Sequence, residues 1–329
     1  MKILFDGRPL ADRQSGGVRR VAEGLLEALR KQGADITVAT TGATRPGLSD
    51  KHVDLPNKLL STALWLHLTS FDRLFSTKSD ILFLPNLGWL GTPKIPYALV
   101  VHDLSFLIEP RWFSWKSRLW HQLIGAERQI KNARILFAVS ECTKRDLVRL
   151  LNIPSDRIVV IPLGLDSTFQ SATPTSSTQR KFLLALGAND PRKNAALSKV
   201  VAKETSLELK LVGDASRERV RDEELDQLYA QATAFLYPSW YEGFGLPLHE
   251  AARHGTPCIA STAGALPETA PAGTVFASPS KPQHWIQAVE NILKNPSAYR
   301  TTTLINGWEP AAKLITHHLA HLPTPPHQA

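Results

Sequence analysis

AFLYPSWYEGFGLPLHEA, residues 234–251, joins an apolar run typical of a buried strand to a helical segment through a loop with two glycines. Gly243 and Gly245 can bring backbone N–H groups close to a ligand. Pro247 fits the first turn of a helix, so a helix N-terminus is predicted directly behind the loop. Loop and helix-end N–H groups attract anions. A strand, loop and helix in this order are typical of an α/β domain that binds phosphate.

Two carboxylates flank this loop, Glu242 at its start and Glu250 in the first turn of the helix. Carboxylates accept hydrogen bonds from sugar hydroxyls, whereas the backbone N–H groups between them suit a phosphate. The alternative is a glycine-rich turn with two ordinary surface glutamates. We expect a site for a phosphorylated sugar, with backbone groups from Gly243, Phe244, Gly245 and Leu246.

Short apolar runs alternate with helical stretches along the whole chain, which predicts parallel α/β sheets covered by helices on both faces. The 329 residues exceed the roughly 250–300 that one core usually supports. The polar stretch QSATPTSSTQR, residues 170–180, has no periodicity and is interpreted as an interdomain linker. We expect one domain over residues 1–167 and another from residue 180 onward.

The bulk properties restrict the function classes. The N-terminus MKILFDGRPL lacks the apolar core of a signal peptide, and no apolar run approaches the ~20 residues that cross a bilayer, so we expect a cytoplasmic protein. Cys142 and Cys258 lack the spacing of a zinc site, and two buried, reduced thiols are expected. The net charge of +8 indicates an anionic partner, which charge alone does not identify.

Three further stretches are candidates for chemistry, and each also has a plain structural interpretation. Gly16 and Gly17 precede a helical segment and could admit a phosphate, or simply form a turn. His102 follows the apolar run YALVV, where open parallel sheets bind ligands, but it could equally bond only to backbone. Arg192 and Lys193 follow the run FLLAL and could pair with a diphosphate, or lie on a solvated surface.

These motifs together resemble the retaining glycosyltransferases of family 4, which have the GT-B fold. They occur in the family's order: GGVRR, VHDLSF, FAVSECTKRDL, IPLGLD, GANDPRKN, DEELDQLYAQA and YEGFGLPLHEA. The resemblance implies two Rossmann-like domains whose parallel sheets face each other across a deep cleft. It implies an acceptor-binding domain over residues 1–167, a nucleotide-sugar-binding domain over 180–307, and a last helix, about residues 308–322, that crosses back onto the first domain.

The resemblance implies four residues at the reacting centre. His102 would face the transferred sugar and help to stabilise charge there, while Arg192 and Lys193 would neutralise the departing diphosphate. Glu242 would hold the donor sugar. A nucleophilic role for Glu242 stays open, because a front-face route, in which the leaving phosphate takes the acceptor's proton, fits equally well. No cofactor is implied, and no two aspartates are separated by a single residue, so we expect no catalytic metal.

The donor would be bound from both domains. Gly16 and Gly17 would approach its phosphate and sugar, the backbone of residues 243–246 would hold the sugar, and Glu250 would bind the ribose hydroxyls. Because Glu250 can accept hydrogen bonds from both ribose hydroxyls, a ribonucleotide donor is favoured over a deoxythymidine donor. GANDPRKN is similar to bacterial mannosyl- and rhamnosyltransferases, so GDP-mannose is the expected donor and a glycan or lipid-linked hydroxyl the expected acceptor.

Three departures from the family pattern affect the site. Ala188 follows Gly187 where many relatives have an arginine, so neutralisation of the diphosphate would depend on Arg192 and Lys193. The stretch after LVGDA is short, which leaves the base-binding loop undefined. His249 stands where a hydrophobic residue is usual, and it is either neutral or alters the pocket.

Two other functions fit parts of the sequence. Another GT-B enzyme, such as a sugar-nucleotide epimerase or a phosphorylase, would share the fold, but an epimerase would need no separate acceptor. A nucleic-acid-binding protein would explain the charge of +8, but the sequence has no recognisable nucleic-acid-binding motif and no run of lysines. We therefore expect no nucleic-acid partner.

Residues 111–133, RWFSWKSRLWHQLIGAERQIKNA, combine tryptophans with cations. This mixture suits the surface of an anionic bilayer, so we expect peripheral attachment to the inner face of the cytoplasmic membrane. The alternative is that Trp115, Leu119 and Leu123, which recur every four residues, pack on the protein's own domain.

Overall fold

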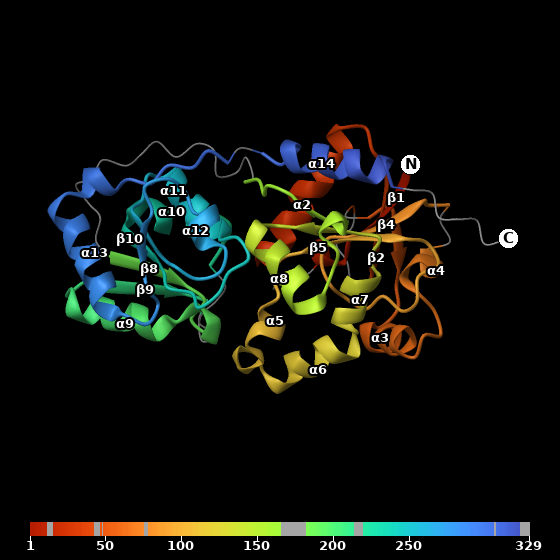
Figure 1. Ribbon diagram of the computed structural model, residues 1–329, viewed down its shortest axis with the longest axis horizontal. Helices are drawn as coiled ribbons and strands as arrows, with labels where there is room; N and C mark the ends of the chain where they lie inside the picture. Colours follow the sequence, from red (N-terminus) through yellow and green to blue (C-terminus); the bar gives the residue numbers. More distant parts are fainter. Residues whose placement is uncertain are drawn as a thin grey trace.

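The computed structural model describes residues 1–11, 16–42, 47, 49–75, 78–165, 182–213, 220–305 and 307–322. The expected linker at residues 170–180, the loop after Gly213 and the terminal PTPPHQA lie outside these residues. Figure 1 shows two α/β units side by side, one from each half of the chain. Within the described ranges, no helix is both long enough and apolar enough to span a bilayer.

The N-terminal unit is built on a seven-stranded parallel sheet with the order β3-β2-β1-β4-β5-β6-β7. Its central strands are buried on both faces because helices cover a parallel sheet from both sides. The strands are β1 (Lys2–Asp6), β2 (Asp35–Thr41), β3 (Lys51–Val53), β4 (Ile81–Leu84), β5 (Tyr97–Val101), β6 (Ile135–Ala138) and β7 (Ile158–Val160). The helices are α1 (Arg8–Ala11), α2 (Gly16–Lys31), α3 (Asn57–Trp65), α4 (Phe71–Phe75), α5 (Ser105–Ile108), η1 (Pro110–Trp112), α6 (Trp115–Leu123), α7 (Ala126–Asn132), α8 (Glu141–Leu151) and η2 (Ser155–Arg157).

The C-terminal unit has a five-stranded parallel sheet with the order β12-β11-β10-β8-β9. The strands are β8 (Phe182–Leu186), β9 (Glu208–Val212), β10 (Ala232–Tyr237), β11 (Cys258–Ser261) and β12 (Val275–Ala277). The helices are η5 (Pro191–Lys193), α9 (Ala195–Glu204), α10 (Asp222–Gln231), α11 (Leu246–Arg253), α12 (Leu266–Thr269), α13 (Pro282–Lys294) and η6 (Pro296–Tyr299). Because β8 and β10 are neighbours, the loops that follow them lie at one edge of this sheet.

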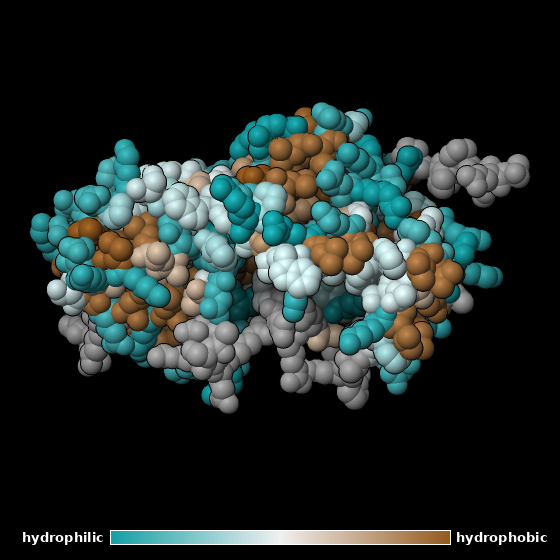
Figure 2. All heavy atoms as spheres, turned by 90° about the horizontal axis from the view of Figure 1, so that it is seen from below, coloured by the Kyte–Doolittle hydropathy of each residue, from teal (hydrophilic) through white to brown (hydrophobic). Residues whose placement is uncertain are grey.

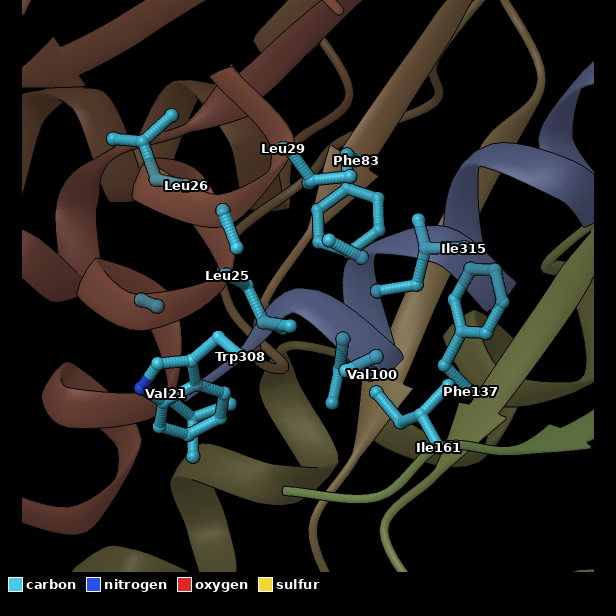
Figure 3. Close-up of a cluster of buried hydrophobic side chains, with 14 of the residues drawn as sticks. Val21, Leu25, Leu26, Leu29, Phe83, Val100, Phe137, Ile161, Trp308 and Ile315 are labelled. Atoms are coloured by element: carbon cyan, nitrogen blue, oxygen red, sulfur yellow. The ribbon is translucent and has the colours of Figure 1, made fainter. Parts of the chain in front are cut away.

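The last helix, α14 (Glu309–Ala320), returns to the N-terminal unit and packs along α2 (Figure 1). Trp308, directly before α14, is 5% exposed and lies against Gly24 of α2, where a Cβ atom would overlap the indole ring. Figure 3 shows Trp308 and Ile315 among the buried side chains of α2 and the first sheet. The predicted helix that crosses back onto the N-terminal unit is present.

The two cysteines are free thiols and differ in burial. Cys258 is buried in β11, as expected. Cys142 is only half-buried, because it lies in the first turn of α8, where its N–H group donates to Glu268 of the C-terminal unit at 3.2 Å. The expectation of two buried thiols is therefore wrong for Cys142.

We expect Trp308→Ala to lower the free energy of unfolding by about 3–5 kcal/mol, the usual cost of deleting a large buried aromatic side chain. The reason is the cavity that would remain against Gly24. Chemical denaturation followed by circular dichroism measures this loss. Leu304→Ala is the matched control, because Leu304 is 89% exposed; its effect should stay below about 0.5 kcal/mol. Equal losses in both variants would contradict the anchoring role of Trp308.

Candidate active site

Two neighbouring strands of the second sheet bring three charged side chains together. β8 and β10 pair in parallel, so the loops at their carboxyl ends lie side by side. Arg192 and Lys193, in η5 after β8, form ion pairs with Glu242, after β10, at 2.9 and 2.7 Å. The structure thus joins residues that the sequence assigned to separate parts of a donor, the diphosphate and the sugar.

The Glu242 carboxylate is buried and fully engaged. Its Oε1 accepts a hydrogen bond from Lys193, and its Oε2 pairs with Arg192. Burial alone would raise the pKa of this carboxyl group, but Lys193 and Arg192 outweigh burial and lower the pKa to about 2. Lys193 also donates to the hydroxyl oxygen of Tyr237 at 2.7 Å. Glu242 is therefore ionised at neutral pH and holds both cations in place.

The glycine loop after Glu242 presents free backbone N–H groups. Among the described residues, no hydrogen bond uses the N–H groups of residues 243–246. Gly245 has φ +102°, a left-handed conformation that favours glycine. Leu246 begins α11, so the unpaired groups of the loop are continuous with those of a helix N-terminus. This backbone can hold the anion that the sequence predicts here.

Gly243 brings this loop against the N-terminal unit. A Cβ atom at this position would overlap the carbonyl oxygen of His102, so the contact requires glycine. The His102 ring donates from Nε2 to the carbonyl oxygen of Pro85 at 2.8 Å, since a carbonyl can only accept. Burial lowers the pKa of His102, which favours the neutral ring. Nδ1 of His102 is then an acceptor for a donor such as a sugar hydroxyl.

A cavity of about 460 Å³ lies between the two units. Val18 of α2 and His102 line it from the N-terminal unit, and Arg192 lines it from the C-terminal unit. Gly16 and Gly17 form the start of α2 directly before Val18, the residue of this helix that lines the cavity. The cavity thus adjoins the charged cluster through Arg192, and residues of both units line it.

The Glu250 carboxylate is buried at an interdomain ion pair. Its Oε1 pairs with Arg20 of α2, and its Oε2 accepts from the Tyr229 hydroxyl at 2.9 Å. Arg20 also pairs with Asp222 of α10 at 2.8 Å. The ribose-binding role of Glu250 stays a prediction, and the ion pair with Arg20 is a contact that the sequence did not indicate.

His249, the departure from the family pattern, supports the glycine loop through structural hydrogen bonds. Its Nδ1 is 2.8 Å from the Thr303 hydroxyl, and its Nε2 is 2.6 Å from the carbonyl oxygen of Thr269. The Thr269 hydroxyl in turn donates to the carbonyl oxygen of Phe244. Burial lowers the pKa of His249 to about 4, so the ring is neutral.

Several residues of the site were not singled out from the sequence, although Arg20, Tyr229 and Tyr241 lie within quoted motifs, in GGVRR, DEELDQLYAQA and YEGFGLPLHEA. Arg20, Tyr229 and Tyr237 bond to predicted site residues, and Tyr241 donates to Asp146 of α8 across the two units at 2.5 Å. The available signals were weak. Tyr237 ends a strand that leads into the glycine loop, and Arg20 follows the first glycine pair by one helical turn.

The stretch that the sequence associates with a membrane forms η1, α6 and α7. In α6, Trp115, Leu119 and Leu123 are 64%, 43% and 37% exposed. The alternative that they pack on their own domain is therefore wrong. Ser114 caps the helix by accepting from the Ser117 N–H group, and Trp120 of the same helix lines the interdomain cavity.

Comparisons with known proteins agree with this architecture. Residues 15–169 match the family model for Glycosyltransferase Family 4, and residues 169–295 match that for Glycosyl transferases group 1. The structure is similar to sucrose-phosphate synthase from Thermosynechococcus elongatus, with a TM-score of 0.72 and 19% identity, over 98% of this chain and 99% of that one. The chain belongs to the family 4 glycosyltransferases with the GT-B fold, as the sequence motifs predict.

Two similar proteins are named as mannosyltransferases. The O-antigen chain mannosyltransferase B of Escherichia coli is 30% identical over 215 residues, which are 54% of this chain and 56% of that protein. The MMP α-(1→4)-mannosyltransferase of Mycolicibacterium hassiacum is 31% identical over 188 residues, 48% of this chain and 44% of that protein. The matched stretches thus span about half the length of these relatives.

We expect His249 to make the stability of the protein depend on pH. Its pKa is about 4 when folded against an ordinary value of 6.5. The unfolded chain therefore binds the proton first, and stability falls as the pH drops from 6.5 toward 4, by up to about 3 kcal/mol. Thermal unfolding of wild type and His249→Gln between pH 4 and 7 measures the effect. The variant should lose less stability over this range, and parallel pH profiles would contradict the assignment.

Proposed function

We propose that the chain is a retaining mannosyltransferase that moves a mannosyl group from GDP-mannose to a hydroxyl of a glycan or lipid-linked acceptor, without a metal or other cofactor. The observation that carries the proposal is the cluster of Arg192, Lys193 and Glu242 beside the free N–H groups of residues 243–246, where the loop meets His102. Membership of the family supports glycosyl transfer, and the names of the relatives support mannose.

The two cations suit a diphosphate leaving group. Lysine has three N–H donors and arginine five, so Arg192 and Lys193 keep donors for phosphate oxygens while they hold Glu242. Negative charge grows on the diphosphate as its bond to the sugar breaks. Fixed cations stabilise that transition state more strongly than the ground state, and only this difference raises turnover.

The ion pairs of Glu242 favour an orienting role over attack on the sugar, because both carboxylate oxygens are held by cations. We propose a front-face route. The bond from the anomeric carbon to the diphosphate oxygen breaks, the acceptor oxygen bonds to the same face of that carbon, and the acceptor's proton passes to the departing phosphate. His102 would accept a hydrogen bond from a hydroxyl of the transferred sugar through Nδ1.

Lys193→Ala should lower kcat by about 100–1000-fold and raise KM much less, since one donor to a developing oxyanion is worth that much. The assay measures mannosyl transfer and GDP release from GDP-mannose with a panel of mannosides. Lys199→Ala, at an exposed lysine of α9, is the matched control. GDP release should require an acceptor. GDP release without an acceptor would favour an epimerase or hydrolase. A near-native kcat in Lys193→Ala would contradict the proposed catalytic centre.

The exposed face of α6 is the proposed site of attachment to the membrane that carries the acceptor. On α6, Trp115 and Leu119 are exposed beside Lys116 and Arg118, while Trp120 lines the interdomain cavity. Exposed aromatic and aliphatic side chains among cations suit the interface of an anionic bilayer. Docking through α6 at the inner face of the cytoplasmic membrane would bring the cleft next to a lipid-linked acceptor.

A second cavity, of about 670 Å³, supports the same docking surface. Trp65 at the end of α3 and Leu123 at the end of α6 line it, with the cations Lys94, Arg128 and Arg134. None of the described residues that line it is a carboxylate, so it favours anionic groups. Figure 2, which views the molecule from below, shows hydrophobic patches over both units, including the right half of the view, where the N-terminal unit lies.

Liposome co-sedimentation tests the docking surface. Binding should require anionic lipid and weaken with added salt, because salt screens surface charges. The double variant Lys116→Glu/Arg118→Glu should lower the partition coefficient by at least roughly 30-fold, at about 1 kcal/mol per cation lost, because the added carboxylates are also repelled by anionic lipid. Lys199→Glu/Lys203→Glu, at two exposed lysines of α9, is the matched control and should bind like wild type. Equal binding to neutral and anionic vesicles, or to neither, would rule out this surface.

A further inference from the structure

Arg20 connects the two units at the residue expected to hold the donor's ribose. It lies in α2, one helical turn after Gly16. Its Nη1 pairs with Oε1 of Glu250, and its Nη2 pairs with Oδ1 of Asp222 at 2.8 Å. Both carboxylates belong to the C-terminal unit, in α11 and α10. The contact therefore links the helix that borders the cleft to the donor half of the site.

The contact is deeply buried at one end and open at the other. The side chains are 1% exposed for Glu250, 17% for Arg20 and 66% for Asp222. A carboxylate as buried as Glu250 needs partners, because an uncompensated buried charge is strongly destabilising. Arg20 supplies the charge, and Tyr229 supplies a hydrogen bond at 2.9 Å. Burial lowers the pKa of Arg20, but Glu250 and Asp222 outweigh burial and raise the pKa above its ordinary value.

A ribose diol on Glu250 would donate to the same two carboxylate oxygens to which Arg20 and Tyr229 are bound. Arg20 is bound to one of these oxygens and Tyr229 to the other. The guanidinium group has five donors and is already bound to Asp222, which is solvent-exposed. Arg20 can therefore release Glu250 and remain paired with Asp222, while the ribose hydroxyls and Tyr229 donate hydrogen bonds to the Glu250 carboxylate.

We propose that Arg20 is a positioning residue of the donor site, which holds the Glu250 carboxylate in the donor-free protein and yields it to the ribose hydroxyls when a nucleotide binds. The inference rests on the proposed function, because it takes Glu250 as the ribose ligand. It makes nucleotide binding compete with a contact between the two units. Arg20 of α2 and the ribose hydroxyls would bind the same carboxylate, that of Glu250.

Calorimetric titration of the full chain tests this competition with GDP, UDP and the 2′,3′-dideoxy counterpart of each. Arg20→Gln removes the competing cation and should tighten the better-bound ribonucleotide about tenfold, the size of one hydrogen bond to a charged group. The dideoxy counterpart has no hydroxyls to exchange and should change by less than about twofold. Arg19→Gln is the matched control, because Arg19 pairs with Glu23 of its own helix at 2.7 Å, and it should leave both affinities unchanged.

Glu250→Ala separates this inference from the proposed function. In that variant the preference for the ribonucleotide over its dideoxy counterpart should disappear. If Glu250→Ala keeps wild-type affinity, or if the wild type binds neither nucleotide, the ribose assignment fails and the inference fails with it. If Glu250→Ala weakens binding while Arg20→Gln leaves it unchanged or weakens it, only the inference is overturned.

Arg20→Lys keeps the test decisive should the glutamine variant fail to fold. Lysine retains the charge, but a single ammonium group lacks the planar fork that bridges Glu250 and Asp222. It should tighten the ribonucleotide in the same direction by a smaller factor. Thermal unfolding of each variant establishes that the chain is folded, and an affinity for the ribonucleotide that falls in Arg20→Lys overturns the inference.

Discussion

The ion pairs from Glu242 to Arg192 and Lys193 set the geometry on which the rest of the site depends. They form because β8 and β10 are parallel neighbours, so loops from two distant stretches of the chain end at one edge of the sheet. A buried carboxylate with a pKa of about 2 fixes both cations before any ligand arrives. The backbone N–H groups that follow are left for an anion. This preorganised charge suits the proposed reaction, in which a diphosphate would depart.

The loop that carries this cluster also joins the two units. Gly243 abuts the carbonyl oxygen of His102, and Tyr241 donates to Asp146 of α8 at 2.5 Å. Both contacts come from residues directly beside Glu242, so the loop that carries the charged cluster is packed against the N-terminal unit.

The helix α14 packs on the N-terminal unit and covers one side of it. Trp308 fills the space that Gly24 leaves open on α2, so the core of this unit contains residues from both ends of the chain. In Figure 1, α14 and α6 lie on opposite sides of the unit. The side bearing α6 keeps exposed Trp115 and Leu119, close to a helix face that lines the cleft. An apolar, cationic surface beside a cleft suits an acceptor carried on a lipid.

The sequence by itself determined the alternation of strands and helices, the glycine loop and the family, because apolar periodicity, glycine conformation and the preference of Pro247 for the first turn of a helix are local properties. It also pointed to Arg192, Lys193 and Glu242. Only the tertiary structure decided which charges meet. Arg20 and Glu250 are 230 positions apart, and their pairing depends on how the two units close. The four-residue repeat of Trp115, Leu119 and Leu123 is compatible with both a buried and an exposed helix face. Helical periodicity determines which side chains share a face but not what covers that face.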